Sequence, residues 1–162
     1  VSMGLELIPA YGRQEEITTL FTEYTDMLME ADPTVRQYLI LQHYEKELER
    51  PESKYGMPEG RLYLAYWDGR LAGCIGLRKL DEECGELKRL YVRSDFRGHQ
   101  IGEQLIRRIL DDAREIGYRH VLLDTLPFLH SAIRLYRKIG FYEIDCYNNS
   151  PVEATIFLQY DL

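Results

Sequence analysis

The sequence has few cysteines, few prolines and no long apolar run, and each scarcity excludes a class of protein. Three scattered cysteines, Cys74, Cys84 and Cys146, cannot all pair and form no CxxC motif, which excludes a disulfide framework. Only 6 Pro and 12 Gly occur among 162 residues, too few for a collagen-like or disordered chain. The most apolar stretches, such as 38–41 and 121–123, are far shorter than the ~20 residues of a membrane helix.

These features predict one folded domain over residues 3–162, with Met3 as the natural start and the two residues before it as additions. The first residues do not show the basic flank and apolar stretch of a signal peptide. Together with the unpaired cysteines, this predicts a protein of the reducing cytoplasm.

Positive charge is in deficit, because 20 Lys and Arg stand against 27 Asp and Glu, a net charge of -7. Such a balance argues against binding to duplex nucleic acid, whose phosphates require a basic surface. An acidic surface instead attracts cationic small molecules. The charged run that contains Glu45, Glu47, Glu49 and Glu52 mildly favours a cationic ligand, although a charge run is usually a solvated face.

Hydrophobic periodicity predicts one mixed α/β sheet, with no linker long enough to divide it. Asp68-Gly69 between two alternating segments predicts a tight hairpin, and Gly117 after an apolar stripe predicts a helix end. The expected order is a strand (4–9), two helices (13–30 and 33–48), a loop (51–60), three strands (61–67, 70–77 and 85–92), a helix (101–116), a strand (121–124), a helix ending at 139, and two strands (141–147 and 152–160) around a turn at 148–151.

The informative segment is the turn between the strand 85–92 and the helix 101–116, which carries the run RGHQIGE at 97–103. A glycine-bearing turn that opens a helix directs backbone N–H groups outward, where the helix dipole adds positive potential. The turn therefore predicts an anion site. It lacks the Gly-Lys-Ser/Thr of a Walker loop and the GxGxxG of a dinucleotide turn.

This run, after a strand that ends Leu-Tyr-Val and before the later segment LYRKIGF at 135–141, resembles the GNAT family of N-acetyltransferases. The resemblance covers essentially the whole chain. The family motif Arg/Gln-x-x-Gly-x-Gly/Ala is read here from Arg97 to Gly102, with Gln100 at the first glycine position and Leu129 where members often have an Asn. The implied fold is α/β, the acyl-CoA N-acyltransferase (GNAT) fold, a single mixed, mostly antiparallel sheet flanked by helices.

The resemblance also implies acetyl-CoA as co-substrate, with its pyrophosphate on the amides of 98–103 and its pantetheine arm along the strand 86–92. Arg97 is expected to meet a phosphate with its fork of donors. The implied cofactor-binding residues are Leu90, Val92, Arg97, Gly98, His99, Gln100, Ile101, Gly102, Glu103 and His130.

Acetyl transfer to an amine requires a neutral nucleophile, a donor for the developing oxyanion and a proton for the departing thiolate. The resemblance implies Glu86 as the general base, the Val92 amide as the oxyanion donor and Tyr136 as the proton donor. From the residues alone, Glu86 is equally a solvated strand residue. The helical spacing of Tyr136, taken alone, favours a core tyrosine.

The acceptor, by resemblance a small-molecule or peptide amine, has no motif that identifies it. A non-catalytic acyl-CoA sensor or regulatory module of the same fold stays open, as does transfer to oxygen or of a longer acyl group. Tyr38, Tyr44, Tyr55 and Tyr147 either line an acceptor pocket or pack in the core. The 4 histidines are too scattered for a metal site, so no metal is expected, and exposed strand edges would allow a homodimer.

Overall fold

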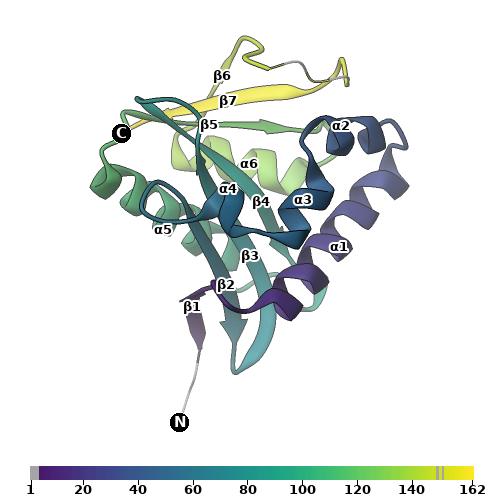
Figure 1. The fold of residues 1–162 in the computed structure, drawn as a ribbon, viewed down its shortest axis with the longest axis vertical. Coiled ribbons are helices and arrows are strands. Elements are labelled where there is room, and N and C mark those ends of the chain that lie inside the picture. Colours follow the sequence, from purple (N-terminus) through teal and green to yellow (C-terminus); the bar gives the residue numbers. More distant parts are fainter. Residues whose placement is uncertain (1–3, 149, 151) are drawn as a thin grey trace.

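One mixed sheet carries the chain in the computed structural model, which describes residues 4–148, 150 and 152–162 (Figure 1). The strands are β1 (Leu5–Pro9), β2 (Arg61–Trp67), β3 (Arg70–Lys79), β4 (Cys84–Val92), β5 (His120–Thr125), β6 (Tyr142–Ile144) and β7 (Ile156–Asp161). The helices are α1 (Gln14–Ala31), α2 (Val35–Leu41), α3 (Tyr44–Glu49), α4 (Glu52–Tyr55), α5 (Ile101–Ile116) and α6 (His130–Ile139). Within the described part of the chain, every helix is too short or too polar to cross a membrane.

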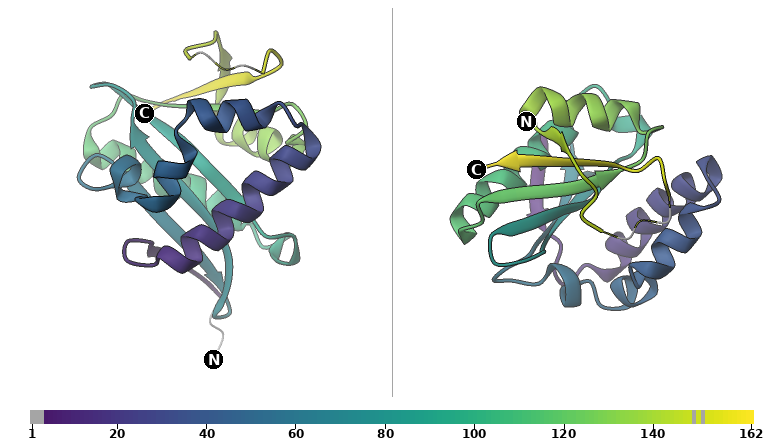
Figure 2. Two further views of the ribbon diagram at one scale, coloured as in Figure 1. Left: turned by 45° about the vertical axis from the view of Figure 1, so that its right-hand side comes forward. Right: turned by 90° about the horizontal axis from the view of Figure 1, so that it is seen from above.

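The described strands form a seven-stranded sheet in the order β1-β2-β3-β4-β5-β7-β6. The β4–β5 pair is parallel, and the other neighbouring strands are antiparallel. Helices α5 and α6 pack on one face, and α1 to α4 lie on the other, so both faces are covered (Figures 1 and 2). The predicted mixed, mostly antiparallel sheet flanked by helices is confirmed.

The hairpin turn at Asp68-Gly69 and the end of α5 at Gly117 form as the sequence predicts. Asp68 and Gly69 have φ of +48° and +79°, the two positive values that a type I′ turn requires, and they join β2 to β3. Helix α5 buries Leu105 and Ile109 against the sheet and ends at Gly117, whose φ of +109° suits a left-handed cap.

The helix expected over 33–48 is wrong as a single element, because α2 ends at Leu41 and α3 begins at Tyr44. His43 between them has φ +56°, a left-handed conformation that a helix interior excludes. Neither glycine nor proline occurs between 34 and 50 to mark this break. Helix α4 lies in the segment expected to be a loop.

Helix α3, which follows the break, contributes Glu47 to a buried cluster of charged side chains. The Glu47 side chain on α3 accepts hydrogen bonds from Arg89 Nε on β4 (2.6 Å), from Lys54 Nζ (2.7 Å) and from the Tyr55 hydroxyl (2.9 Å). Arg89 also donates to Gln42 Oε1 at 2.7 Å. Burial alone would raise the pKa of Glu47, but the charges of Arg89 and Lys54 outweigh it and lower that pKa to about 2. Ion pairing thus fastens α3 and α4 to the sheet.

Glu47→Gln is expected to lower the free energy of unfolding at pH 7 by about 3 kcal/mol, because it leaves the buried Arg89 uncompensated. The folded-state pKa of Glu47 lies below its ordinary value, so its contribution is present above pH ~4.5 and is lost as pH falls toward ~2. Urea unfolding from pH 7 to pH 2.5 measures this. The variant is expected to lose stability less steeply than the native protein over that range, and parallel curves would contradict the assignment.

The two final strands are shorter than expected, because β6 covers Tyr142–Ile144 and β7 begins only at Ile156. The segment between them is largely irregular. Residues 149 and 151 of the turn expected at 148–151 lie outside the described residues.

Candidate active site

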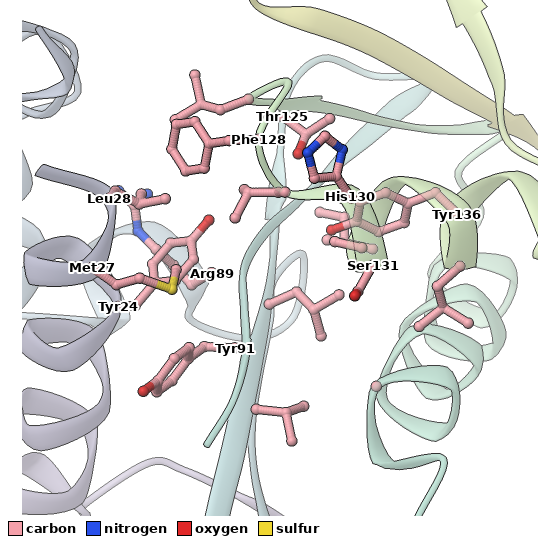
Figure 3. A pocket seen from close by; sticks show the side chains of 18 of the residues that line it. Tyr24, Met27, Leu28, Arg89, Tyr91, Thr125, Phe128, His130, Ser131 and Tyr136 are labelled. Carbon is pink, nitrogen blue, oxygen red and sulfur yellow. The ribbon is translucent and has the colours of Figure 1, made fainter. Parts of the chain in front are cut away.

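A cavity of about 700 Å³ opens where β4 and β5 separate. These strands pair in parallel only from Cys84↔His120 to Glu86↔Leu122, so their later residues diverge and bound the opening. Figure 3 shows its two walls, with Tyr24 and Met27 projecting from α1 and Tyr136 from α6 on the opposite side.

The edge of β4 that faces the cavity offers unpaired backbone groups. Arg93 N–H donates to Ala72 O on the β3 side at 2.8 Å. Since successive residues of a strand direct their N–H and C=O groups to opposite sides, those of Val92 and Leu90 face the side that β5 has left. Both residues line the cavity. An extended ligand can therefore pair with β4 as a further strand would.

The first turn of α5 closes one end of the cavity. Gln104 N–H donates to Gln100 O at 3.1 Å, the first bond of the helical ladder. Among the hydrogen bonds of the described residues, none is donated by a backbone amide of 98–103, as expected for a helix start without a side-chain cap. The Glu103 carboxylate beside them accepts hydrogen bonds from Lys138 and Arg107, which lower its pKa. The turn thus presents unpaired amide donors beside an acidic residue whose charge is balanced by Lys138 and Arg107.

Gln100 keeps the backbone conformation that glycine would adopt at its position. Its φ and ψ are 60° and 25°, and Gly98 has φ +89°. At Gly102, an added Cβ would lie 3.2 Å from Leu135 Cδ2 on α6, tighter than ordinary side-chain contacts. The missing side chain at Gly102 therefore lets α5 and α6 approach at the cavity wall.

The structure brings almost all of the expected cofactor-binding residues to this one cavity. Those that line it are Leu90, Val92, Arg97, Gly98, Gln100, Ile101, Gly102, Glu103 and His130. His99 is the exception, because its ring stacks on Trp67 of β2 with 4.1 Å between ring centroids. This stack holds the turn to the sheet.

Tyr136 lies on the cavity wall, and its ring packs against Phe141. The residue is 5% exposed, and no hydrogen bond of its hydroxyl occurs among the described residues, so that group is free to bond a ligand. Burial, with smaller effects of Tyr24 and Asp124, raises the pKa of Tyr136 well above its usual value. The hydroxyl therefore stays protonated at physiological pH.

Glu86 lies at the last paired position of β4 but does not line the cavity. Its carboxylate accepts hydrogen bonds from Arg78 Nε and from the Tyr147 hydroxyl, each at 2.6 Å. Burial alone would raise the pKa of Glu86, but the charges of Lys88 and Arg78 and these hydrogen bonds lower it. A carboxylate so engaged is a weak proton acceptor, and the catalytic role of Glu86 stays a prediction.

The sequence model of the Acetyltransferase (GNAT) family matches residues 17–141. The chain belongs to this family. It is 33% identical over 126 residues to an uncharacterized N-acetyltransferase of Schizosaccharomyces pombe, an alignment that covers 76% of this chain and 77% of that protein. The recognition made from the 97–102 motif is confirmed, and the GNAT chain is an acetyltransferase.

Solved structures share the fold of this GNAT chain. An acetyltransferase from Streptococcus agalactiae superposes with a TM-score of 0.80 at 19% identity, covering 99% of both chains. The PaiA N-acetyltransferase of Thermoplasma acidophilum, solved in complex with coenzyme A, gives 0.75 at 17% identity, covering 99% of this chain and 100% of that one. The GNAT fold expected from the sequence is confirmed.

Asp124 is a cavity carboxylate that the sequence analysis missed. It lies on β5 just beyond the last residue paired with β4, and it lines the opening. The Tyr38 hydroxyl and Asn148 Nδ2 (2.7 Å) both donate to Asp124 Oδ2, and no hydrogen bond to Oδ1 occurs among the described residues. One carboxylate oxygen of this acetyltransferase is therefore available to an acceptor. The signal in the sequence was a charged residue directly after the apolar run 121–123.

The four tyrosines considered for an acceptor pocket separate into two groups. Tyr38 lines the cavity, whereas the hydroxyls of Tyr55, which is buried, and of Tyr147, which is half-buried, donate to Glu47 and Glu86. Tyr44 packs under the Arg89 guanidinium. The acidic run is also absent from the cavity wall described here, because the lining includes none of Glu45, Glu47, Glu49 and Glu52.

The expected Asn position is occupied by Leu129, which lines the cavity just before α6. His130 and Ser131 follow it on the same wall (Figure 3). Within the described residues, no group of three or more His, Cys, Asp or Glu side chains is placed to hold a metal ion.

Proposed function

We propose that this chain transfers the acetyl group of acetyl-CoA to a primary amine by direct attack within a ternary complex. The observation that carries the proposal is that one cavity is lined both by the turn that opens α5, with its unpaired amides, and by the Asp124 carboxylate. Membership of an acetyltransferase family supplies the reaction class.

The described residues fit acetyl-CoA. The amides of 98–103 and the Arg97 guanidinium provide donors for the pyrophosphate, and an exposed Arg97 is free to bind it bidentately. The open edge of β4 at Leu90 and Val92 provides alternating donors and acceptors for the amide-containing pantetheine arm. A relative of the same fold was solved with coenzyme A, which supports the assignment.

When bound, the thioester supplies an activated acetyl group with a thiolate leaving group. The Val92 N–H is a fixed donor at the strand edge, suited to the negative charge that develops on the carbonyl oxygen. Asp124 Oδ1 accepts the proton that the amine must lose before or during attack. The Tyr136 hydroxyl, held protonated by burial, donates a hydrogen bond to the departing sulfur and so stabilises the thiolate.

Direct attack is favoured because the cavity offers no thiol to carry the acetyl group. Cys74 is buried and its Sγ donates to Arg89 O at 3.3 Å, and burial raises the pKa of that thiol. Neither Cys84 nor Cys146 is among the described residues that line the cavity. A covalent acetyl-enzyme on cysteine is therefore not expected.

The test is acetylation of a panel of primary amines with acetyl-CoA, followed by thiol release and by the mass of the acetylated product. Varying both substrates is expected to give intersecting double-reciprocal lines, as a ternary complex requires. Parallel lines would indicate a covalent intermediate and contradict direct attack. A protein that binds acetyl-CoA but acetylates no amine would instead support the sensor alternative.

Tyr136→Phe is expected to lower kcat about tenfold to a hundredfold while leaving the affinity for acetyl-CoA nearly unchanged. The ring and its packing on Phe141 are retained, and only the hydroxyl that faces the leaving group is lost. Steady-state kinetics and a calorimetric titration measure the two quantities. A variant with native kcat would remove Tyr136 from the mechanism.

A further inference from the structure

Lys88 is a buried cation with no close anionic partner. Its side chain is 6% exposed, and it lines the cavity. Its ion-pair partner among the described residues is Glu86, with 3.8 Å between Nζ and Oε1, beyond hydrogen-bond distance. No hydrogen bond of its Nζ occurs among the described residues, and Nζ stays open to the cavity, so its donors can bond an anionic ligand there.

The charges nearest Lys88 on β4 are matched within the protein, whereas Asp124, bonded to the Tyr38 hydroxyl, has only neutral partners among the described residues. Glu86 is bonded more closely by Arg78 and Tyr147 than by Lys88. The neighbouring Arg89 donates hydrogen bonds from its guanidinium to Glu47 and to Gln42, between α2 and α3. Besides Arg97 at the turn before α5, Lys88 is therefore a cavity cation whose donors are free for a ligand among the described residues.

A bulge in β4 places the side chains of Lys88 and Arg89 on the same face of the sheet. The register between β3 and β4 shifts between Cys74 and Gly76, opposite Arg89, whose φ is +59°. Because of the extra residue, consecutive side chains leave the same face of the sheet. Lys88 lies over the Tyr38 ring, and Arg89 lies over the Tyr44 ring on the same helical layer.

Tyr38 connects Lys88 to Asp124. The Lys88 ammonium lies 5.9 Å from the centroid of the Tyr38 ring, and the hydroxyl of that ring donates to Asp124 Oδ2. Both groups thus lie at the same tyrosine side chain, and both residues line the cavity.

Resting on the function proposed above, we propose that the acceptor is an amine that also carries a carboxylate, with the carboxylate on the Lys88 ammonium and the amine on Asp124 Oδ1. Met27, Leu28 and Phe128 add apolar side chains to the same cavity. We therefore expect an amino acid with an apolar side chain as the acceptor. This reverses the mild preference for a cationic acceptor that the acidic run suggested.

The experiment compares three acceptors that share an amine and a phenyl ring, namely phenylalanine, phenylalaninamide and 2-phenylethylamine. The native protein is expected to acetylate phenylalanine with a kcat/KM at least about tenfold above that of either analogue. Lys88→Met is expected to reduce that preference at least about tenfold, mainly through the KM for phenylalanine, and Lys88→Arg to retain most of it. Each comparison between proteins uses the same amines, so differences in amine basicity cancel.

Acetyl-CoA affinity and thermal unfolding of each variant serve as controls, and both are expected to match the native protein. The native preference alone tests the inference if Lys88→Met fails to fold. Equal or faster acetylation of the analogues by the native protein would overturn the inference and leave the proposed function intact, as would a Lys88→Met variant that slows all three amines equally. Failure to acetylate any of the three by a protein that acetylates another primary amine of the panel would overturn the inference and leave the proposed function intact, whereas failure on the whole panel would overturn both.

Discussion

Asp124→Asn is expected to lower kcat/KM for amine acetylation about 10²- to 10⁴-fold at neutral pH, the usual loss when a general base is removed. An amine acceptor is largely protonated at that pH and must lose a proton to attack. Asparagine keeps the shape of the side chain and can keep its contact with the Tyr38 hydroxyl, but it cannot accept the proton on Oδ1.

The pH profile separates catalysis from structure in this variant. If Asp124 acts as a base, the activity of Asp124→Asn rises about tenfold per pH unit as pH approaches the pKa of the amine, because the solvent then removes the proton. A merely structural role would leave a uniformly low profile. Native activity at pH 7 in the variant would remove Asp124 from the mechanism.

Glu86→Gln is the matched comparison, because it also changes one carboxylate to an amide at the same end of the divergent strands. We expect it to lower stability by breaking the pairing with Arg78, with a loss of kcat/KM much smaller than that of Asp124→Asn. The reverse order of the two losses, with native acetyl-CoA affinity in both variants, would assign the base to Glu86.

Gly102→Asp is expected to raise the Kd for acetyl-CoA at least about a hundredfold, measured by calorimetry. The new carboxylate lies in the first turn of α5, among the amides that would hold the pyrophosphate, and like charges in close contact cost several kcal/mol. Its Cβ would also press on Leu135 Cδ2. An acidic residue near a helix N-terminus favours the helix itself, so the loss is expected without unfolding.

Gly102→Ala provides the graded control. It adds the same Cβ without the charge, and since Leu135 is a flexible side chain the change in Kd is expected to be only a few fold. Native affinity in the Asp variant would show that the pyrophosphate does not lie at this turn. Equal losses in both variants would mean that packing, and not charge, controls the site.

The elements that depend on local signals were predictable from the sequence. The positive φ values at 68 and 69, the α5 stripe with its Gly117 cap and the strand-to-helix turn at 97–102 all follow from short-range patterns. That turn also carried the family recognition, now confirmed. Most of the residues expected to bind the cofactor share one cavity because they lie on consecutive elements, β4 and α5.

The features that the sequence analysis predicted wrongly or missed depend on contacts between residues far apart in the chain. The break at His43 has no local breaker and accompanies the pairing of Glu47 with Arg89, 42 residues later. Whether a carboxylate faces the cavity depends on its partners, which a single sequence does not reveal. The Glu86 carboxylate accepts a hydrogen bond from Tyr147, which lies 61 residues later in the chain, whereas one oxygen of Asp124 stays free.

The central claim is that this cavity is an acetyl-CoA site, and a calorimetric titration of the native protein with acetyl-CoA tests it most directly. We expect one site per chain with a micromolar Kd, and competition by CoA. Absence of binding to acetyl-CoA, CoA and longer acyl-CoAs by folded protein would contradict the claim and leave the GNAT fold here with another use.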